Sequence, residues 1–442
     1  MSRRRKRKVP TEPVAVRING LSHDGRGVAE VDGKKLFVHD ALPGERVLAR
    51  ITACMRRYDE GEAIEVTEPS DDRVTPACAH FGVCGGCALQ HMEPAAQLKA
   101  KQNTLLQNLD RIGKVKPQRI LEPLAGPVWH YRRKARLSVR YVFKKERLLV
   151  GFRERQGRYV AEMEECHVLD ERIAQQLPRI TALLTGMEGR ERIPQVEVAC
   201  GDEDCALIFR HLDPLSQSDT AALRSFAATT GIAVLLQPGG PESITSLEPE
   251  TLDLNFTIPE FGITLRFGPS DFIQVNAELN RAMVHHAIDL LQAGPDDRVL
   301  DLFCGLGNFT LPLATRAAQV VGVEGDMALV EKARDNARRN GLENCEFHLA
   351  DLTAEVSQSA WLRQPYTKIL LDPPRSGALE MLPHLAGTTA GRLVYVSCHP
   401  ASLARDAGIL VHEHGFELAA AGVMDMFPHT GHVESIALFE RR

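Results

Sequence analysis

From Arg298 onward the chain repeats strand, turn and helix, and this repetition constrains the fold more than any other feature. The unit DRVLDLFCGLGNFTLPLA reads as an apolar strand ending at Asp301 and Leu302, a turn containing Gly305 and Gly307, and a helix. Repeated units of this kind form an α/β sheet of largely parallel strands. The sequence therefore predicts a Rossmann-like domain that binds its ligands at the carboxyl ends of the strands.

Acidic residues end the next two strands. AQVVGVEGD ends at Glu324, where a carboxylate can accept hydrogen bonds from ribose hydroxyls, and CEFHLADL ends at Asp351, within reach of an adenine edge. A nicotinamide enzyme would show the same pattern. The turn lacks G-x-G-x-x-G, which counts against that class.

A fourth strand, KILLDPPRSG, places Asp372 beside two prolines, which hold the following loop extended and rigid. Enzymes that methylate amino groups usually carry Asn or Asp, two prolines and an aromatic residue here. Arg375 replaces the aromatic residue. The loop therefore favours methylation of a base carbon over methylation of a nitrogen.

The fifth strand, RLVYVSCHPASLARD, ends at Cys398. C5 of uracil is too weak a nucleophile to attack a sulfonium methyl, but a thiolate that adds to C6 turns C5 into an enolate carbon. This chemistry predicts Cys398 as a covalent nucleophile. Because a free thiol is mostly protonated at neutral pH, we expect the site to favour the thiolate through His399 or through the N-terminus of the next helix.

After methyl transfer, a base must remove the C5 proton before the cysteine can leave. Glu434, in DMFPHTGHVESIALF, follows a turn and begins the final apolar strand, so we expect it at the same sheet edge as Cys398. His429 and His432 are alternatives for this role.

The first part of the chain is basic. Lys and Arg exceed Asp and Glu by 14 in residues 1–160, whereas residues 161–442 carry a net charge of −19. This asymmetry predicts a polyanionic partner for the first part. Residues 1–9 are predicted to be a basic tail, and five short β-rich runs in residues 10–69 predict a small barrel.

Three cysteines lie close together in CAHFGVCGGC, where Cys78, Cys84 and Cys87 have the spacing C-x5-C-x2-C. Such thiols can share one metal centre, and Cys166 is the candidate fourth ligand of an iron–sulfur or zinc site. The other cysteines outside the catalytic motifs belong to no such closely spaced cluster and are interpreted as structural: Cys54, Cys200, Cys205 and Cys345. A disulfide framework is not expected in a cytosolic chain.

A helix is predicted from Gln97 to Gly113. The stretch after it, VWHYRRKARLSVRYVFKKERLLVGFRERQGRYV, combines eleven Lys or Arg residues with Trp129, Tyr131 and Tyr141. Cations for phosphates beside aromatic rings for stacking predict an RNA-facing surface. Residues 70–260 are interpreted as a central domain and residues 261–442 as the catalytic domain.

Nearly the whole chain resembles the RNA uridine-C5 methyltransferases. Residues 10–69 resemble the TRAM domain, an OB-like RNA-binding barrel, through LSHDGRGVAEVDGKKLFVHDALPGERV. The other carriers of the likeness are CAHFGVCGGC with Cys166, HYRRKARLS, SDFIQVN, DLFCGLGNFTLPLA, LLDPPRSG, VYVSCHPASLARD and DMFPHTGHVES. The resemblance implies a class I S-adenosylmethionine-dependent methyltransferase domain, a central α+β iron–sulfur domain and the TRAM barrel.

The resemblance also assigns roles to individual positions. It implies Cys398 as nucleophile and Glu434 as base. It implies a [4Fe-4S] cluster on Cys78, Cys84, Cys87 and Cys166. It implies S-adenosylmethionine contacts from Gln274, Phe303, Asn308, Glu324, Asp351 and Asp372. At one position the chain departs from the family: His399 stands where Asn is more frequent, which we expect to alter the tuning of the thiol without loss of activity.

Barrel and cysteine cluster together favour the members that methylate one specific uridine in 23S ribosomal RNA. A dual-site ribosomal enzyme, a transfer-RNA enzyme and an RNA-binding assembly factor with an inactive methyltransferase fold are the alternatives. A cytosine-C5 methyltransferase would need a Pro-Cys motif, which DPPRSG lacks. We expect a cytoplasmic protein without membrane contact, because no apolar run approaches membrane-spanning length. A monomer without an obligate protein partner is the default expectation.

Overall fold

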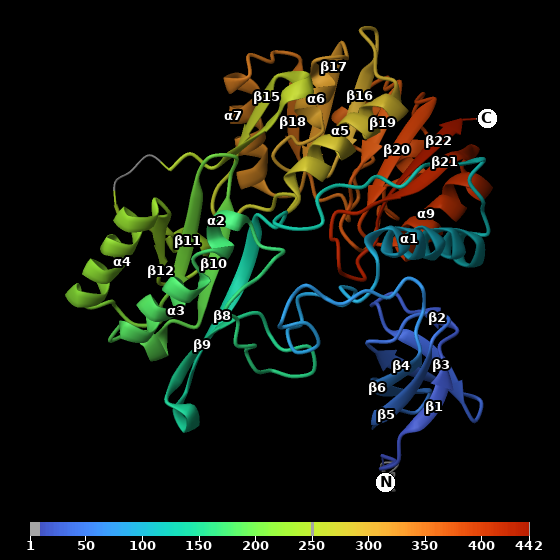
Figure 1. Ribbon diagram of the computed structural model, residues 1–442. Helices are drawn as coiled ribbons and strands as arrows, with labels where there is room; N and C mark the ends of the chain where they lie inside the picture. Colours follow the sequence, from blue (N-terminus) through green and yellow to red (C-terminus); the bar gives the residue numbers. More distant parts are fainter. Residues whose placement is uncertain (1–8, 249–251, 442) are drawn as a thin grey trace, which may run out of the picture. The chain divides into compact units, whose positions relative to one another are not determined.

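The computed structural model describes residues 9–248 and 252–441, so nearly all of the predicted basic tail lies outside the described residues. The chain divides into two compact units. The first comprises residues 1–101, 152–161 and 427–432, and the second comprises residues 102–151, 162–426 and 433–442. Figure 1 labels their helices and strands along the sequence.

The first unit contains a six-stranded sheet with the order β1-β5-β6-β4-β3-β2. Its strands are β1 (Val14–Arg17), β2 (Gly20–Leu21), β3 (Gly27–Val31), β4 (Lys34–His39), β5 (Arg46–Cys54) and β6 (Tyr58–Glu68). All five predicted strands form, and they bury alternate apolar residues such as Leu36, Val38 and Val47 in one core. The two-residue β2 is too short to leave a periodic signal in the sequence.

Helix α1 (Pro94–Asn108) begins three residues before the predicted start, with Pro94 in its first turn, where the missing N–H costs no hydrogen bond. The helix continues as the π-helical turn η1 (Leu109–Gly113), so its end agrees with the prediction.

The central part of the second unit is a six-stranded sheet with the order β13-β12-β11-β10-β8-β9. Its strands are β8 (Lys134–Val142), β9 (Arg147–Gly151), β10 (Gln195–Cys200), β11 (Cys205–Arg210), β12 (Ala233–Gln237) and β13 (Thr245–Ser246). The helices of this part are α2 (Glu171–Ala174), α3 (Leu177–Gly186) and α4 (Gln217–Thr230). A two-stranded sheet, β14 (Asn255–Ile258) with β15 (Ile263–Arg266), follows in the sequence.

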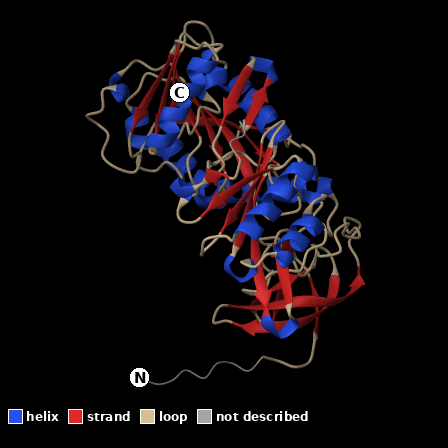
Figure 2. Ribbon diagram, turned by 90° about the vertical axis from the view of Figure 1, so that its left-hand side faces the viewer, coloured by secondary structure: helices blue, strands red, loops and turns tan. Residues whose placement is uncertain are grey.

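The carboxyl-terminal part forms an eight-stranded sheet with the order β18-β17-β16-β19-β20-β22-β21-β7. Its strands are β7 (Arg119–Ile120), β16 (Arg298–Leu302), β17 (Gln319–Glu324), β18 (Cys345–Leu349), β19 (Lys368–Leu371), β20 (Arg392–Ser397), β21 (Phe416–Met424) and β22 (Glu434–Arg441). The helices are α5 (Ala277–Leu291), α6 (Thr310–Ala314), α7 (Met327–Arg339), α8 (Leu382–Ala386) and α9 (Pro400–Glu413). Figure 2 shows the helices and strands of the chain from a second direction.

Short 3-10 turns connect several of these elements. They are η2 (Phe143–Lys145), η3 (Arg190–Arg192), η4 (Pro241–Ser243), η5 (Pro259–Phe261) and η6 (Trp361–Arg363). Among the described residues, no helix combines the length and apolar character needed to cross a lipid bilayer.

The strands from β18 to β20 pair in parallel, as the sequence predicts. Their apolar runs, such as Leu393–Val396 of β20, are fully buried, as expected where both faces of a sheet are covered. The exception to the parallel order is β22, which lies antiparallel between β20 and β21. This insertion brings the amino-terminal end of β22 to the carboxyl-terminal end of β20.

Candidate active site

Cys398 directly follows β20 and is half-buried. Ser397 pairs with Ser435 across the antiparallel ladder, and the Ser435 hydroxyl donates a hydrogen bond of 3.1 Å to the Ser397 carbonyl. Glu434, the first residue of β22, is 6 % exposed. The register therefore places Glu434 at the strand end that carries Cys398.

The charges around Cys398 act mainly against its ionisation. Burial and, to a smaller extent, the carboxylates of Glu434 and Asp372 raise the pKa of the thiol to about 11, although the Arg375 guanidinium acts to lower it. In the ligand-free protein the thiol is therefore protonated at neutral pH. The side chain that favours the thiolate is Arg375, for which the sequence supplied no such role.

His399 has a structural task. It is the N-cap of α9: its Nδ1 accepts a hydrogen bond of 3.3 Å from the Ser402 N–H and lies 2.9 Å from the Ser402 hydroxyl. Asn is among the best N-cap residues because its side-chain oxygen accepts the same bond. Nδ1 of His399 therefore caps α9 in the way that the side-chain oxygen of an Asn at this position would.

Asp372 follows β19, and its backbone N–H donates to the Leu302 carbonyl at 3.3 Å. This bond ties the loop after β19 to the end of β16. Burial raises the pKa of Asp372 to about 7.

The turn after β16 uses the left-handed backbone region repeatedly. Phe303 has φ +64°, Gly305 +55° and Gly307 +97°. The tight path lets the Gly305 N–H donate to Glu324 Oε2 at 3.0 Å. Glu324 Oε1 accepts from the N–H groups of the next two residues, so backbone donors fix the orientation of this carboxylate.

Asp301 is a site residue to which the sequence assigned no role. It is fully buried, and its Oδ2 accepts from the Thr310 hydroxyl while its Oδ1 has no hydrogen-bond partner among the described residues. Burial and the charges of Asp372 and Glu324 raise its pKa to about 8, although the hydrogen bond from Thr310 acts to lower it. A carboxylate inside the apolar run VLDL was the signal that could have identified it.

Asn308 pairs with a second residue that sequence reasoning missed. Asn308 and Asn280 exchange two side-chain hydrogen bonds of 2.9 Å, and Asn280 lies on α5 with 3 % exposure. Asp351 is exposed after β18, and its Oδ1 accepts from the N–H and the hydroxyl of Thr353. These contacts fix the amide and the carboxylate in one orientation each.

Gln274 lies half-buried in the segment before α5. This segment is anchored from two sides: Lys134 Nζ donates to the carbonyls of Pro269 and Asp271 at 2.7 Å, and Lys332 forms an ion pair with the Asp271 carboxylate. Two residues before Gln274, Phe272 is 72 % exposed.

The predicted metal ligands belong to different units. Cys78, Cys84 and Cys87 lie in the first unit, and Cys166, 8 % exposed, lies in the second. Burial raises the pKa of the Cys84 thiol and the nearby Cys78 raises it further, while the Gly86 N–H donates to Cys84 Sγ at 3.4 Å. Neighbouring sulfurs that accept backbone N–H donors suit a thiolate metal site.

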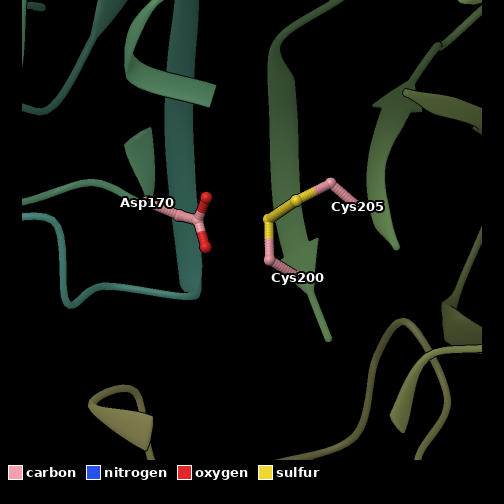
Figure 3. A group of neighbouring side chains, drawn as sticks. All are labelled: Asp170, Cys200 and Cys205. Carbon is pink, nitrogen blue, oxygen red and sulfur yellow. A yellow bond between two sulfur atoms is a disulfide. The ribbon is translucent and has the colours of Figure 1, made fainter. Parts of the chain in front are cut away.

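A different cysteine pair is joined in the central sheet. Cys200 and Cys205 are cross-strand partners in β10 and β11 and form a disulfide (Figure 3). Both cysteines thus have a structural role, as interpreted, but the expectation that each is isolated is wrong, because the β10–β11 register brings them together. Asp170 lies close enough to make a three-residue group with them, but its carboxylate binds Arg172. The disulfide leaves no free thiolate in this group to bind a metal.

The predicted RNA-facing surface is smaller than the sequence suggested. On β8, Arg136 and Arg140 are exposed, in alternation with buried apolar residues. Tyr131 is only 4 % exposed, so its predicted role in base stacking is wrong. Arg133, one of the predicted cations, forms an ion pair with Asp202 inside the second unit and is only 12 % exposed, so it is not available at the surface.

Comparison with known proteins yields two family matches. Residues 93–442 match the model described as tRNA (Uracil-5-)-methyltransferase, and residues 11–64 match the TRAM domain.

Two relatives cover essentially the full chain. A protein of Xanthomonas euvesicatoria pv. vesicatoria (strain 85-10) named 23S rRNA (uracil(1939)-C(5))-methyltransferase RlmD is 55 % identical over 445 residues, which are 100 % of both chains. A protein of the same name from Alkalilimnicola ehrlichii is 53 % identical over 439 residues, or 99 % of both chains.

Among solved structures, the Pyrococcus abyssi tRNA (uracil-54, C5)-methyltransferase in complex with S-adenosyl-L-homocysteine superposes with a TM-score of 0.73 at 21 % identity. The match covers 96 % of this chain and 99 % of that one. The two chains therefore share a fold.

Proposed function

The chain belongs to the family described as tRNA (Uracil-5-)-methyltransferase, and on this premise we propose that it methylates C5 of uridine 1939 in 23S ribosomal RNA, as its full-length relatives are named to do. S-adenosylmethionine supplies the methyl group. The proposal rests on one observation: Cys398, at the end of β20, and Glu434, at the start of the antiparallel strand β22, lie at the same end of neighbouring strands.

The proposed reaction has three steps. The Cys398 sulfur adds to C6 of the uracil, which makes C5 an enolate carbon. C5 then takes the methyl group as its bond to the sulfonium sulfur breaks, so that S-adenosylhomocysteine leaves, and Glu434 removes the C5 proton. The electrons of the C–H bond restore the C5–C6 double bond as the C6–S bond breaks, which releases the thiolate.

Six residues are proposed to contact S-adenosylmethionine: Gln274, Phe303, Asn308, Glu324, Asp351 and Asp372. The left-handed turn after β16 supports this assignment because glycines there allow a close approach of the backbone to a ligand. The fixed orientation of Glu324 suits an acceptor for ribose hydroxyls, and Asp351 is exposed enough to be reached.

We assign a [4Fe-4S] cluster to Cys78, Cys84, Cys87 and Cys166, with tetrahedral zinc as the alternative. The proximity of Cys78 and Cys84 and the N–H donor to sulfur support a metal site in this loop. Iron and sulfide analysis after anaerobic purification distinguishes the two metals, since a colourless protein with one zinc would contradict the cluster.

The proposed RNA contacts come from the TRAM barrel and from the exposed cations of β8, Arg136 and Arg140. The protein is proposed to act in the cytoplasm as a monomer, without an obligate protein partner.

The test traps the covalent intermediate. The protein is incubated with S-adenosylmethionine and a 5-fluorouridine-containing 23S RNA fragment, in which fluorine replaces the proton that the base removes. We expect an adduct that survives denaturation, that Cys398→Ala abolishes and that Cys345→Ala, a change at another half-buried cysteine, leaves intact. The absence of an adduct with the unmodified protein overturns the mechanism. An adduct with a transfer-RNA fragment alone overturns the substrate.

A further inference from the structure

Helix α9 starts two residues after Cys398 and forms hydrogen bonds to the loop that follows β19. The Ser402 hydroxyl donates to the Arg375 carbonyl at 2.7 Å, and Arg405 Nη2 donates to the Ser376 carbonyl at 2.8 Å. One turn further along the same helix face, Asp406 Oδ2 accepts from the Ala378 N–H at 2.9 Å. The helix therefore holds the backbone of this loop at three of four successive residues.

Asp406 is the centre of this contact. It is fully buried, its Oδ2 also accepts from the Tyr395 hydroxyl at 2.7 Å, and its Oδ1 accepts from Arg405 Nε at 2.8 Å. Tyr395 lies on β20, three residues before Cys398. One carboxylate thus joins the strand that carries the nucleophile, the helix after it and the neighbouring loop.

Gly377 shows how closely helix and loop approach. Its φ is +85°, and a Cβ at this position would lie 2.6 Å from both Asp406 Oδ2 and Arg405 Nη2. Only glycine accepts this conformation and this distance without a shift of the loop.

The loop bears two of the charged groups that act on the thiol. Burial and the Glu434 and Asp372 carboxylates raise the pKa of Cys398, and Arg375 lowers it. Glu434 lies on β22, whereas Asp372 and Arg375 lie on the loop after β19. Of these three charged groups Arg375 is the cation, and His399 caps α9. A loop that moved away from α9 would take this cation from the sulfur.

We propose that Asp406, together with Ser402 and Tyr395, is a positioning residue that holds the Arg375 loop against α9 so that the guanidinium faces the Cys398 sulfur. The inference rests on the proposed function, because it assigns these residues to the step in which the sulfur attacks the base. None of the three contacts the substrate in this proposal, since all three act through Arg375.

The experiment measures the single-turnover rate of adduct formation on 5-fluorouridine RNA between about pH 6 and pH 9. For a thiol that is mostly protonated, the rate rises about tenfold per pH unit. Asp406→Asn is expected to displace this line to higher pH by up to about one pH unit, and thus to lower the neutral-pH rate by up to about tenfold. Tyr395→Phe and Ser402→Ala, which each remove one hydroxyl, are expected to give smaller displacements in the same direction.

The matched control is Asp219→Asn. Asp219 is also buried, at 2 % exposure, and its carboxylate accepts from the N–H groups of Glu188 and Gly189 in the central part of the second unit. This substitution is expected to lower thermal stability without displacing the pH line.

A double-mutant cycle with Arg375→Gln separates positioning from general destabilisation. If Asp406 acts through Arg375, Asp406→Asn displaces the line in the wild-type background and causes no further displacement beside Arg375→Gln. Equal displacements in both backgrounds, or an unchanged line in the folded Asp406→Asn and Tyr395→Phe proteins, overturn the inference. If Asp406→Asn does not fold, Tyr395→Phe and Ser402→Ala decide it. No adduct with the unmodified protein is a different result, because it refutes the proposed function.

Discussion

Replacing Glu434 by glutamine is expected to separate the two halves of the proposed reaction. The Cys398 pKa of about 11 leaves roughly one thiol in ten thousand ionised at pH 7. After burial, the Glu434 carboxylate is the largest contribution to this raised pKa. A nearby like charge accounts for on the order of one pKa unit, so its removal should increase the thiolate fraction, and with it the rate of attack on C6, about tenfold.

The same substitution removes the proposed base. A positioned general base contributes a factor of about 10² to 10⁴, so loss of the C5 proton should slow by that factor. Attack becomes faster and elimination slower, and the methylated adduct should therefore accumulate on ordinary uridine RNA. The shape of the side chain is kept, which limits other effects at this buried position.

Rapid quenching followed by denaturing electrophoresis measures the adduct, and transfer of a labelled methyl group to RNA measures product. Glu434→Gln should show a fast rise of adduct to about one per enzyme, and then product release about 10² to 10⁴ times slower than wild type. Turnover at the wild-type rate without accumulated adduct would refute the assignment of Glu434. Accumulation in a His432→Gln or His429→Gln protein instead would transfer the role to that histidine.

Further outcomes follow from individual contacts. His399→Asn should keep the cap of α9 and the activity, whereas His399→Ala should lose about 1 kcal/mol of stability in a denaturant titration; equal stability of the two variants would contradict the capping role. The folded pKa of Asp301, about 8, lies above its unfolded value of 3.8, so its stabilising contribution is present below about pH 4 and is lost as the pH rises toward 8. Asp301→Asn should therefore increase the free energy of unfolding of the ligand-free protein at pH 8 by on the order of 1–3 kcal/mol, and so raise its melting temperature there. Near pH 4 the melting temperature should be unchanged; a uniform shift at both pH values would contradict this account. Cys84→Ser should lower the iron content of anaerobically purified protein and bleach its visible absorbance, while Cys54→Ser should leave both unchanged; full iron content in Cys84→Ser would remove it from the ligand set.

Much of the catalytic domain follows from local sequence pattern. The apolar runs before Asp301, Glu324, Asp372 and Cys398 are long enough to predict strands, and parallel strands in such folds bring their carboxyl ends to one edge. The barrel strands and α1 are likewise visible because their apolar residues recur with periods of about 2 and 3.6. The candidate site residues at the strand ends could therefore be named from the sequence alone.

Other features depend on partners that are distant in sequence. Residues 434–441 are recognisable as a strand, but their antiparallel insertion between β20 and β21 is set by packing of the whole sheet, and only that direction puts Glu434 at the end of β20. The pairing of Cys200 with Cys205 needs the register of β10 on β11. The burial of Tyr131 depends in the same way on the residues that surround it in the fold.

The electrostatic environment of Cys398 is the clearest case. Sequence proximity pointed to His399, but the ring caps α9, and the cation that acts on the sulfur is Arg375, 23 positions earlier in the chain. A pKa responds to charges a few ångströms away and to burial, whatever their separation along the chain. The amino-acid sequence thus determined which strand presents the thiol, and the tertiary structure decided which charges surround it.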